Sequence, residues 1–205
     1  MSAKQPGREN FWKAHLRMRL FSWYTGFFVW SCLMFSSEEA IFSAIVSAPF
    51  GRMGIRTENA SVSELVYLPE RYREKSASDA VAENAARQVQ SYFADPDFIF
   101  ELPLKNAGTL FQQKVWKAIS DIPRGEIRTY GQLAKSLRSA PRAVGQACGA
   151  NWFPLIIPCH RVTAAGGIGG FAHHDDVDGF HIRVKRFLLE WESAPGYASI
   201  WSGRG

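Results

Sequence analysis

The chain has 205 residues, of which 46% are hydrophobic and 21% charged, a composition that is typical of globular proteins and excludes a disordered chain. The formal net charge is +5, and between residues 105 and 161 nine basic residues stand against two acidic ones, which fits a phosphate-rich partner as well as an ordinary solvated surface. The three cysteines make an odd number, which disfavours a disulfide framework, predicts a reducing compartment and leaves a thiol available for chemistry.

Residues 1–39 form an atypical N-terminal extension. Five basic residues and one acidic residue precede an uncharged, aromatic-rich run from Leu20 to Phe35. This order is that of a signal peptide or a short membrane anchor, but the run is too short for a comfortable span and lacks a clear cleavage site. We therefore expect a natural start further downstream or a poorly packed extension, with no membrane partner, and keep an anchor as the alternative.

Residues 40–104 are predicted to form a small α/β domain. Alternating residues from Ile41 to Ser47 predict a strand, and the segments 53–56 and 62–68 predict two more. Asp79 can cap a helix that extends to Phe93, and the alternation of Phe98, Phe100 and Leu102 predicts a final strand. Because this domain contains no catalytic constellation, its expected role is support.

Residues 105–205 are predicted to form a second, mainly helical domain. Thr109 can cap a helix that ends near Ser120, and Thr129 can cap a second one from Tyr130 to about residue 137. Pro141 suits the first turn of a third helix, which extends to about residue 150. Two short helices with a tight break between them are typical of a helix-turn-helix, although many such pairs bind nothing.

The chemistry of the chain is expected at Cys159 and His160. An apolar segment with two prolines, residues 151–158, leads to this pair. Proline stiffens the approach, and a neighbouring imidazole or a positive field favours the thiolate, which is the nucleophilic form of cysteine. The residues alone leave open a second interpretation, in which a buried structural cysteine stands beside a structural histidine.

The run Pro158-Cys159-His160-Arg161-Val162 resembles the active-site signature of the methylated-DNA–protein-cysteine methyltransferases, the O6-alkylguanine-DNA alkyltransferases. Further blocks that resemble the family occur in order at residues 111–116, 122–125, 129–134, 141–145 and 184–192. The resemblance implies a ribonuclease-H-like α/β support domain, followed by a mainly α, winged-helix-like domain with the helix-turn-helix. It also implies a cytoplasmic monomer that acts on double-stranded DNA with O-alkylated bases and needs no cofactor.

The resemblance implies a role for each candidate catalytic residue. Cys159 is expected to take the alkyl group from O6-alkylguanine, with O4-alkylthymine as a further candidate, and each molecule is expected to act once. His160, held through a water to Glu192, is expected to draw the thiol proton away. Tyr130 is expected to share a proton with the departing base. Taken singly, Glu192 is also explained as an acid at a helix end, and Tyr130 as a packing aromatic.

The resemblance also assigns residues to the DNA and to the base. Arg142 is expected to enter the space that the flipped-out nucleotide leaves, with the helix in the minor groove. Asn151 is expected to bond to backbone and tie the helix turn to the active-site loop, and the Val162 carbonyl to accept from the base. Small residues that allow close approach to DNA, and that helix packing explains equally well, are Ala143, Gly145, Ala147 and Gly149.

Two features depart from the family pattern. Trp152 stands where the family usually has proline after the asparagine. Residues 172–181 are longer than the compact glycine-rich loop of the family, so none of them is assigned the family's base-contacting serine. The histidines and aspartates of this loop are candidate metal ligands, but no ligand spacing stands out, and we expect a solvated loop without metal.

Two other classes of function compete with alkyl transfer. A non-enzymatic protein that binds the lesion and recruits other repair factors usually replaces the acceptor cysteine, whereas Cys159 is present here. A Cys-His hydrolase needs an oxyanion hole and makes no use of Arg142 or the basic helices.

Overall fold

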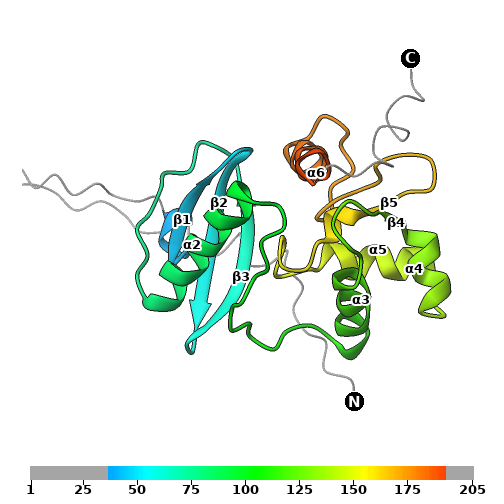
Figure 1. Ribbon diagram of the computed structural model, residues 1–205, viewed down its shortest axis with the longest axis horizontal. Coiled ribbons are helices and arrows are strands. Elements are labelled where there is room, and N and C mark those ends of the chain that lie inside the picture. Colours follow the sequence, from blue (N-terminus) through cyan, green and yellow to red (C-terminus); the bar gives the residue numbers. More distant parts are fainter. Residues whose placement is uncertain (1–36, 193–205) are drawn as a thin grey trace, which may run out of the picture. The chain divides into compact units, whose positions relative to one another are not determined.

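The structure is a computed structural model in which residues 37–192 are described, all within a compact unit that spans Phe35–Gly205 (Figure 1). The helices are α1 (Ser37–Ala40), α2 (Ala80–Ala94), α3 (Leu110–Ser120), α4 (Tyr130–Ser136), α5 (Pro141–Gly149), a 3₁₀ turn η2 (Cys159–Arg161) and α6 (Phe180–Trp191). The strands are β1 (Ala44–Ala48), β2 (Gly51–Glu58), β3 (Ser61–Leu68), β4 (Arg128–Thr129) and β5 (Val162–Thr163). Most of the predicted N-terminal extension lies outside the described residues. No helix within residues 37–192 is both long enough and apolar enough to cross a bilayer.

Strands β1, β2 and β3 form an antiparallel sheet in that order. Both hairpins turn within two residues, since Ala48 pairs with Gly51 and Glu58 pairs with Ser61. Gly51 has a φ of +140°, and a Cβ there would lie 2.6 Å from the Leu68 carbonyl oxygen, so the close approach of β3 requires glycine. The three predicted strands are thus confirmed, although the first begins at Ala44 and leaves Ile41 half exposed.

Helix α2 covers one face of this sheet (Figure 1). It begins as the sequence predicts, because the Asp79 side chain accepts from the Ala82 amide at 2.8 Å and satisfies a free donor of the first turn. Its buried face consists of Ala82, Ala85, Gln88, Val89 and Tyr92. All of these side chains except Gln88 join a cluster of buried hydrophobic residues that continues from the sheet into the helical part of the chain.

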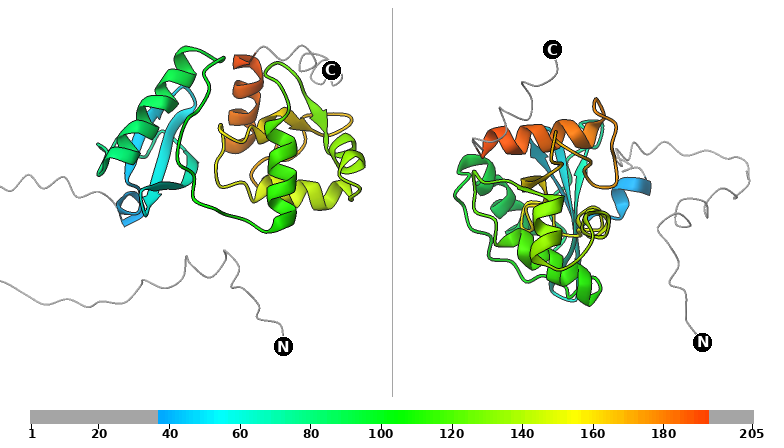
Figure 2. Two further views of the ribbon diagram at one scale, coloured as in Figure 1. Left: turned by 60° about the horizontal axis from the view of Figure 1, so that its bottom comes forward. Right: turned by 90° about the vertical axis from the view of Figure 1, so that its right-hand side faces the viewer.

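The connection from α2 to α3 does not contain the strand predicted over 98–102. It runs from the sheet to the helical part (Figure 2) and pairs with β3 only around Leu104, which bridges Val62. The Gln88 side chain instead bonds both the amide and the carbonyl of Glu101, at 2.8 Å each. Alternating aromatic residues therefore give an extended segment whose backbone is satisfied by a helix side chain rather than by a neighbouring strand.

Helices α3, α4 and α5 pack together away from the sheet (Figures 1 and 2). Thr109 and Thr129 each close a capping box with the glutamine three residues later, which confirms both predicted starts. Pro141 is the first residue of α5, as predicted. The Trp116 indole donates to the Ala147 carbonyl at 2.8 Å and fixes α3 against α5.

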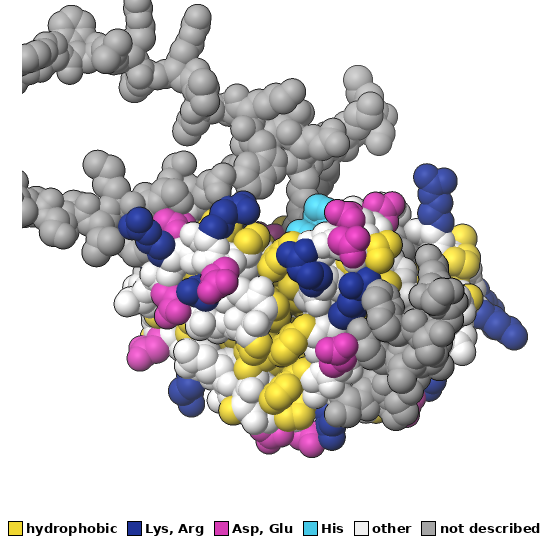
Figure 3. Space-filling view, turned by 90° about the horizontal axis from the view of Figure 1, so that it is seen from above, with side chains coloured by type: hydrophobic (Ala, Val, Ile, Leu, Met, Phe, Trp, Pro, Cys, Tyr) yellow, Lys and Arg dark blue, Asp and Glu magenta, His cyan; other side chains and the backbone are white. Residues whose placement is uncertain are grey.

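Helix α6 brings the end of the described chain back to the sheet and α2. Aromatic contacts connect its Phe187 with Phe50 after β1 and with Phe93 on α2, at ring-centroid distances of 6.0 and 6.5 Å. Hydrophobic side chains reach the surface as a band on the face seen from above (Figure 3). The sheet and the helical part are therefore joined by apolar packing as well as by the polar contacts of the site below.

Candidate active site

Cys159 is the first residue of η2 and directly follows the irregular segment after α5. The Asn151 side chain holds this segment: its Oδ1 accepts from the Phe153 amide at 3.0 Å, and its Nδ2 donates to the Ile157 carbonyl at 2.8 Å. The same Nδ2 lies 3.3 Å from the Cys159 Sγ. One amide therefore both shapes the turn and donates to the thiol sulfur, which favours the thiolate.

Trp152, which stands where the family usually has proline, anchors this segment through its backbone carbonyl. Its carbonyl accepts from the Leu65 amide of β3 at 2.8 Å, so the segment is anchored to the sheet. Leu155 has a φ of +73°, a left-handed conformation that is unfavourable for a branched side chain. Contacts from Asn151 and the sheet hold this strained turn in place.

Cys159 lines a cavity of about 240 Å³. Its walls come from α4, α5, η2 and the loop that precedes α6, and they include Tyr130, Cys148 and Phe171. The Tyr130 hydroxyl donates to the Gly170 carbonyl at 2.9 Å, so the tyrosine is tied to that loop. The cavity thus has a thiol and a phenol in its walls.

The residue after Cys159, His160, is in direct contact with Glu192 inside the protein. His160 is fully buried and Glu192 is 1% exposed, with Nε2 and Oε1 3.0 Å apart. The expected water between them is therefore wrong, because the end of α6 brings the carboxylate against the ring. The two atoms are close without the alignment of a good hydrogen bond, since both ring nitrogens lack a hydrogen-bond partner among residues 37–192.

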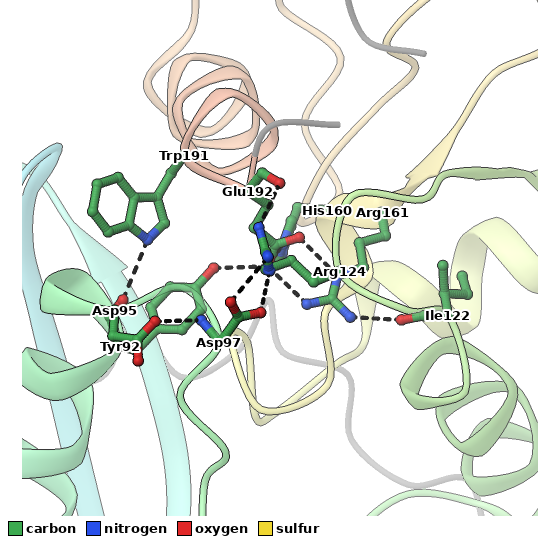
Figure 4. Close-up of polar contacts among 9 residues, drawn as sticks. All are labelled: Tyr92, Asp95, Asp97, Ile122, Arg124, His160, Arg161, Trp191 and Glu192. Carbon is green, nitrogen blue, oxygen red and sulfur yellow. Dashed lines mark hydrogen bonds and ion pairs between the residues drawn. The ribbon is translucent and has the colours of Figure 1, made fainter. Parts of the chain in front are cut away.

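Glu192 is also the centre of a wider network (Figure 4). Arg161 binds it through two nitrogens, Nε to Oε2 and Nη2 to Oε1, each at 2.8 Å. The Tyr92 hydroxyl of α2 donates to Oε1, also at 2.8 Å. Arg124 contacts the Glu192 carbonyl at 3.4 Å and pairs with Asp97, so a second arginine joins the network to the chain after α2.

Burial sets the ionisation of these groups unless a partner opposes it. Burial raises the pKa of the Cys159 thiol, while the Asn151 amide and the positive charge of Lys185 oppose that rise. Burial lowers the pKa of His160, against the attraction of Glu192. Burial also acts to raise the pKa of Glu192, but the contacts from His160 and Arg161 outweigh it and hold that pKa well below its ordinary value. The resting site therefore has a protonated thiol, a neutral imidazole and a carboxylate.

Lys185 is a site residue that the sequence did not single out. Its ammonium group is fully buried and donates to the carbonyls of Val162 and Ile168 at 2.7 Å each and of Gly170 at 3.1 Å. Burial lowers its pKa to about 8, and the two cysteines oppose that shift. The available signal was its position on α6 at helical spacing between Ile182 and Leu188, which are both buried.

The residues that were expected to contact the base and the DNA differ in how accessible they are. Val162 is fully buried, is not among the cavity residues, and its carbonyl is already bonded to Lys185. On α5, Arg142 is exposed and a Cβ on Gly145 would meet no atom within 4 Å. Ala147 is 2% exposed and faces the core. Gly149 is covered by the His173 ring, so α5 offers an open surface mainly in its first half.

The long loop before α6 forms part of the cavity wall. The Phe171 and His174 backbones exchange hydrogen bonds of 2.7 and 2.8 Å, and both residues between them, Ala172 and His173, have positive φ. The His174 and His181 rings stack with centroids 4.0 Å apart. Among residues 37–192, no group of three or more His, Cys, Asp or Glu residues could hold a metal ion.

Known proteins resemble this chain in both sequence and structure. A family model described as the 6-O-methylguanine DNA methyltransferase DNA-binding domain matches residues 110–194. The methylated-DNA–protein-cysteine methyltransferase of Methanosarcina mazei is 34% identical over 156 residues, which cover 72% of this chain and 94% of that protein. The constitutive enzyme of that name from Bacillus subtilis is 44% identical over 111 residues, covering 53% of this chain and 64% of that protein. The crystal structure of Mycobacterium tuberculosis OGT in complex with DNA has a TM-score of 0.59 at 34% identity, covering 76% of this chain and 95% of that one.

Proposed function

Because this chain belongs to the methylated-DNA–protein-cysteine methyltransferase family, we propose that Cys159 removes the alkyl group from O6-alkylguanine in double-stranded DNA, once per molecule. The observation that carries the proposal is the position of the thiol. Cys159 lines a cavity of about 240 Å³, and its sulfur accepts a hydrogen bond from Asn151. The next residue in the chain, His160, is in contact with Glu192. Nucleophilic catalysis needs a nucleophile and a base that a third group orients, and Cys159, His160 and Glu192 are the three groups that we propose for these roles.

The reaction requires a proton to leave the thiol and a proton to reach the base. His160 takes the thiol proton as the general base, and the sulfur attacks the alkyl carbon as the bond from that carbon to guanine O6 breaks. Tyr130 gives or shares a proton at a ring nitrogen of the departing guanine. Burial raises the pKa of Tyr130, so its hydroxyl is a protonated donor throughout the ordinary pH range. The proton that His160 takes from the thiol balances the proton that Tyr130 gives to guanine. The products are therefore neutral guanine and S-alkylcysteine, whose thioether has no easy return path.

The DNA surface that we propose is a helix-turn-helix made by α4 and α5. Four exposed basic residues accompany these helices: Arg128, Lys135, Arg138 and Arg142. Their charges suit the phosphate backbone, and the open first half of α5 at Ala143 and Gly145 suits a close approach in the minor groove. Arg142 fills the gap that the flipped nucleotide leaves. Ala147 and Gly149 are not part of this surface, because one is buried and the other lies under His173.

The finer architecture that we propose follows the family. The sheet with α2, residues 40–104, is a ribonuclease-H-like support domain, and residues 105–205 form a winged-helix-like domain. The protein acts in the cytoplasm as a monomer, on DNA with O-alkylated bases, and needs no cofactor. O4-alkylthymine is a second candidate substrate.

Duplex DNA with a labelled O6-methylguanine tests the proposal. We expect one equivalent of label at most to be transferred to Cys159, as located by mass spectrometry of the tryptic peptide, and none in Cys159→Ala. Cys148→Ala is the matched control, since it removes the other described thiol that lines the cavity and leaves the acceptor in place. Label retained on the DNA with an unmodified Cys159 contradicts the proposal. Lesion binding without transfer, or repeated turnover of a small ester, points to the competing functions.

A further inference from the structure

Glu192 has more donors around one carboxylate oxygen than that oxygen can serve. Its Oε1 lies 2.8 Å from the Tyr92 hydroxyl and 3.0 Å from the His160 Nε2. Arg161 Nη2 also donates to it, at 2.8 Å. Each carboxylate oxygen offers about two lone-pair sites. Tyr92 and Arg161 make hydrogen bonds to Oε1, whereas His160 is as near but poorly aligned.

The Tyr92 hydroxyl therefore competes with His160 for the same oxygen. We propose that Tyr92 is a positioning residue, which holds Glu192 Oε1 and limits how strongly the carboxylate stabilises the protonated form of His160. The consequence for catalysis rests on the alkyl transfer proposed above, because His160 is there the group that takes the proton from Cys159. The contact itself does not depend on that function.

The direction of the effect follows from the two protonation states of the imidazole. A neutral His160 can accept the thiol proton, whereas a His160 that is already protonated cannot. Burial lowers its pKa and keeps it neutral, and Glu192 acts against burial. If Tyr92 released Oε1, the carboxylate would align with the Nε2 proton and stabilise the charged ring. Tyr92 thus keeps the base available at lower pH.

The other charged and titratable groups around His160 and Glu192 must be the same in all the variants that are compared. Arg161 holds both carboxylate oxygens, and Arg124 contacts the Glu192 carbonyl. Further groups from the neighbouring elements are Asp97, which pairs with Arg124, Lys185 of α6, Cys159 of η2 and Tyr67 of β3. Burial raises the pKa of Tyr92 far above its ordinary value, so this phenol stays a neutral donor across the working pH range.

Through Tyr92, the sheet and α2 take part in the catalytic site as well as supporting it. Tyr92 belongs to α2, which packs on the sheet, and lies 100 residues from Glu192 in sequence. Its backbone carbonyl accepts from the Trp191 indole at 3.2 Å, which fixes the end of α6 against α2. The part of the chain that was assigned only a support role contributes a side chain to the catalytic network.

The first test is a histidine NMR titration of the full chain with labelled imidazoles, in which His160→Gln assigns the signal. In Tyr92→Phe we expect the His160 midpoint to rise by about one pH unit, and the acid limb of the transfer rate against pH to rise with it. Tyr72→Phe is the matched control. It makes the same change at a tyrosine that packs against the separate cluster of Phe42, Ile45 and Leu68, and it should leave the midpoint unchanged.

Two further variants keep the test decisive if Tyr92→Phe fails to fold. Site-specific replacement of Tyr92 by 3-fluorotyrosine keeps the hydroxyl and makes it a stronger donor, so the midpoint should fall. In a Glu192→Gln background, Tyr92→Phe should cause no further shift. An unchanged midpoint in Tyr92→Phe, even with slower transfer, assigns Tyr92 a purely structural role and overturns the proposal. Failure of wild-type transfer overturns the proposed function instead, because the titration needs no lesion.

Discussion

The His173 ring lies directly on Gly149, so that a Cβ on this glycine would be 2.6 Å from two atoms of the imidazole. His173 also lines the cavity that contains Cys159. It has a φ of +65° and follows Ala172 at +50°, in a turn closed by Phe171 and His174. A side chain in an unfavourable backbone conformation thus forms part of the wall beside the thiol.

Removal of this ring should enlarge the cavity and change which alkyl groups fit. In His173→Gly we expect the rate of O6-benzylguanine transfer to rise about tenfold relative to that of O6-methylguanine, because steric discrimination in a pocket is of this order. The measurement is the ratio of the two single-turnover rate constants. Ala172→Gly relieves a similar backbone conformation and removes only a methyl group, so its ratio should change little. An equal change in both variants would assign the effect to the turn rather than to the ring.

Asn151 should control the reactivity of the thiol as well as the shape of its segment. In Asn151→Ala the sulfur loses its amide donor, so the pKa of Cys159 rises further and alkyl transfer falls about 10- to 100-fold. The check is the rate of Cys159 modification by iodoacetamide against pH, followed by mass spectrometry. Gln113→Ala removes another amide that bonds to backbone, at the start of α3, and serves as the control. Equal thiol reactivity in Asn151→Ala and wild type would contradict this assignment.

Lys185 should be essential for the fold around the cavity. In Lys185→Met, three carbonyl groups lose the donor that they share, and we expect the free energy of unfolding to fall by about 2–4 kcal/mol. Urea denaturation monitored by tryptophan fluorescence measures this loss. Glu190→Met changes an exposed residue on the same helix and should stay within about 0.5 kcal/mol of wild type. A similar small effect for Lys185→Met would show that the carbonyls find other donors.

The stacked histidines should make the loop sensitive to acid. Burial and the neighbouring His174 lower the pKa of His181 to about 4, below its ordinary value of 6.5. The unfolded chain therefore binds this proton first, and the stability that a neutral His181 provides is full above pH 6.5 and is lost as the pH falls towards 4. Between pH 7 and pH 5 we expect the Tm of wild type to fall more than that of His181→Phe, which keeps a ring in the stack. Parallel Tm curves for the two proteins would refute this.

The sequence determined the features that are completed within a few residues. Asp79, Thr109 and Thr129 cap their helices as predicted, because each cap is satisfied by an amide about three residues further along the chain. The pair Cys159 and His160 was also recognisable, since its neighbours in sequence form a signature. Local hydrogen bonds and short motifs need no knowledge of the rest of the fold.

Only the tertiary structure decided which distant groups meet. Nothing in the sequence places Tyr92 against Glu192, or makes their contact with His160 direct rather than through water. The expected strand at 98–102 is wrong for the same reason. A strand needs a neighbouring strand edge, whereas here the Gln88 side chain makes the hydrogen bonds to the backbone of Glu101. Lys185 lies in the core although lysine favours the surface, because three carbonyls from distant residues converge on it there. Burial and pairing between distant residues depend on the path of the whole chain, and a local sequence pattern does not specify that path.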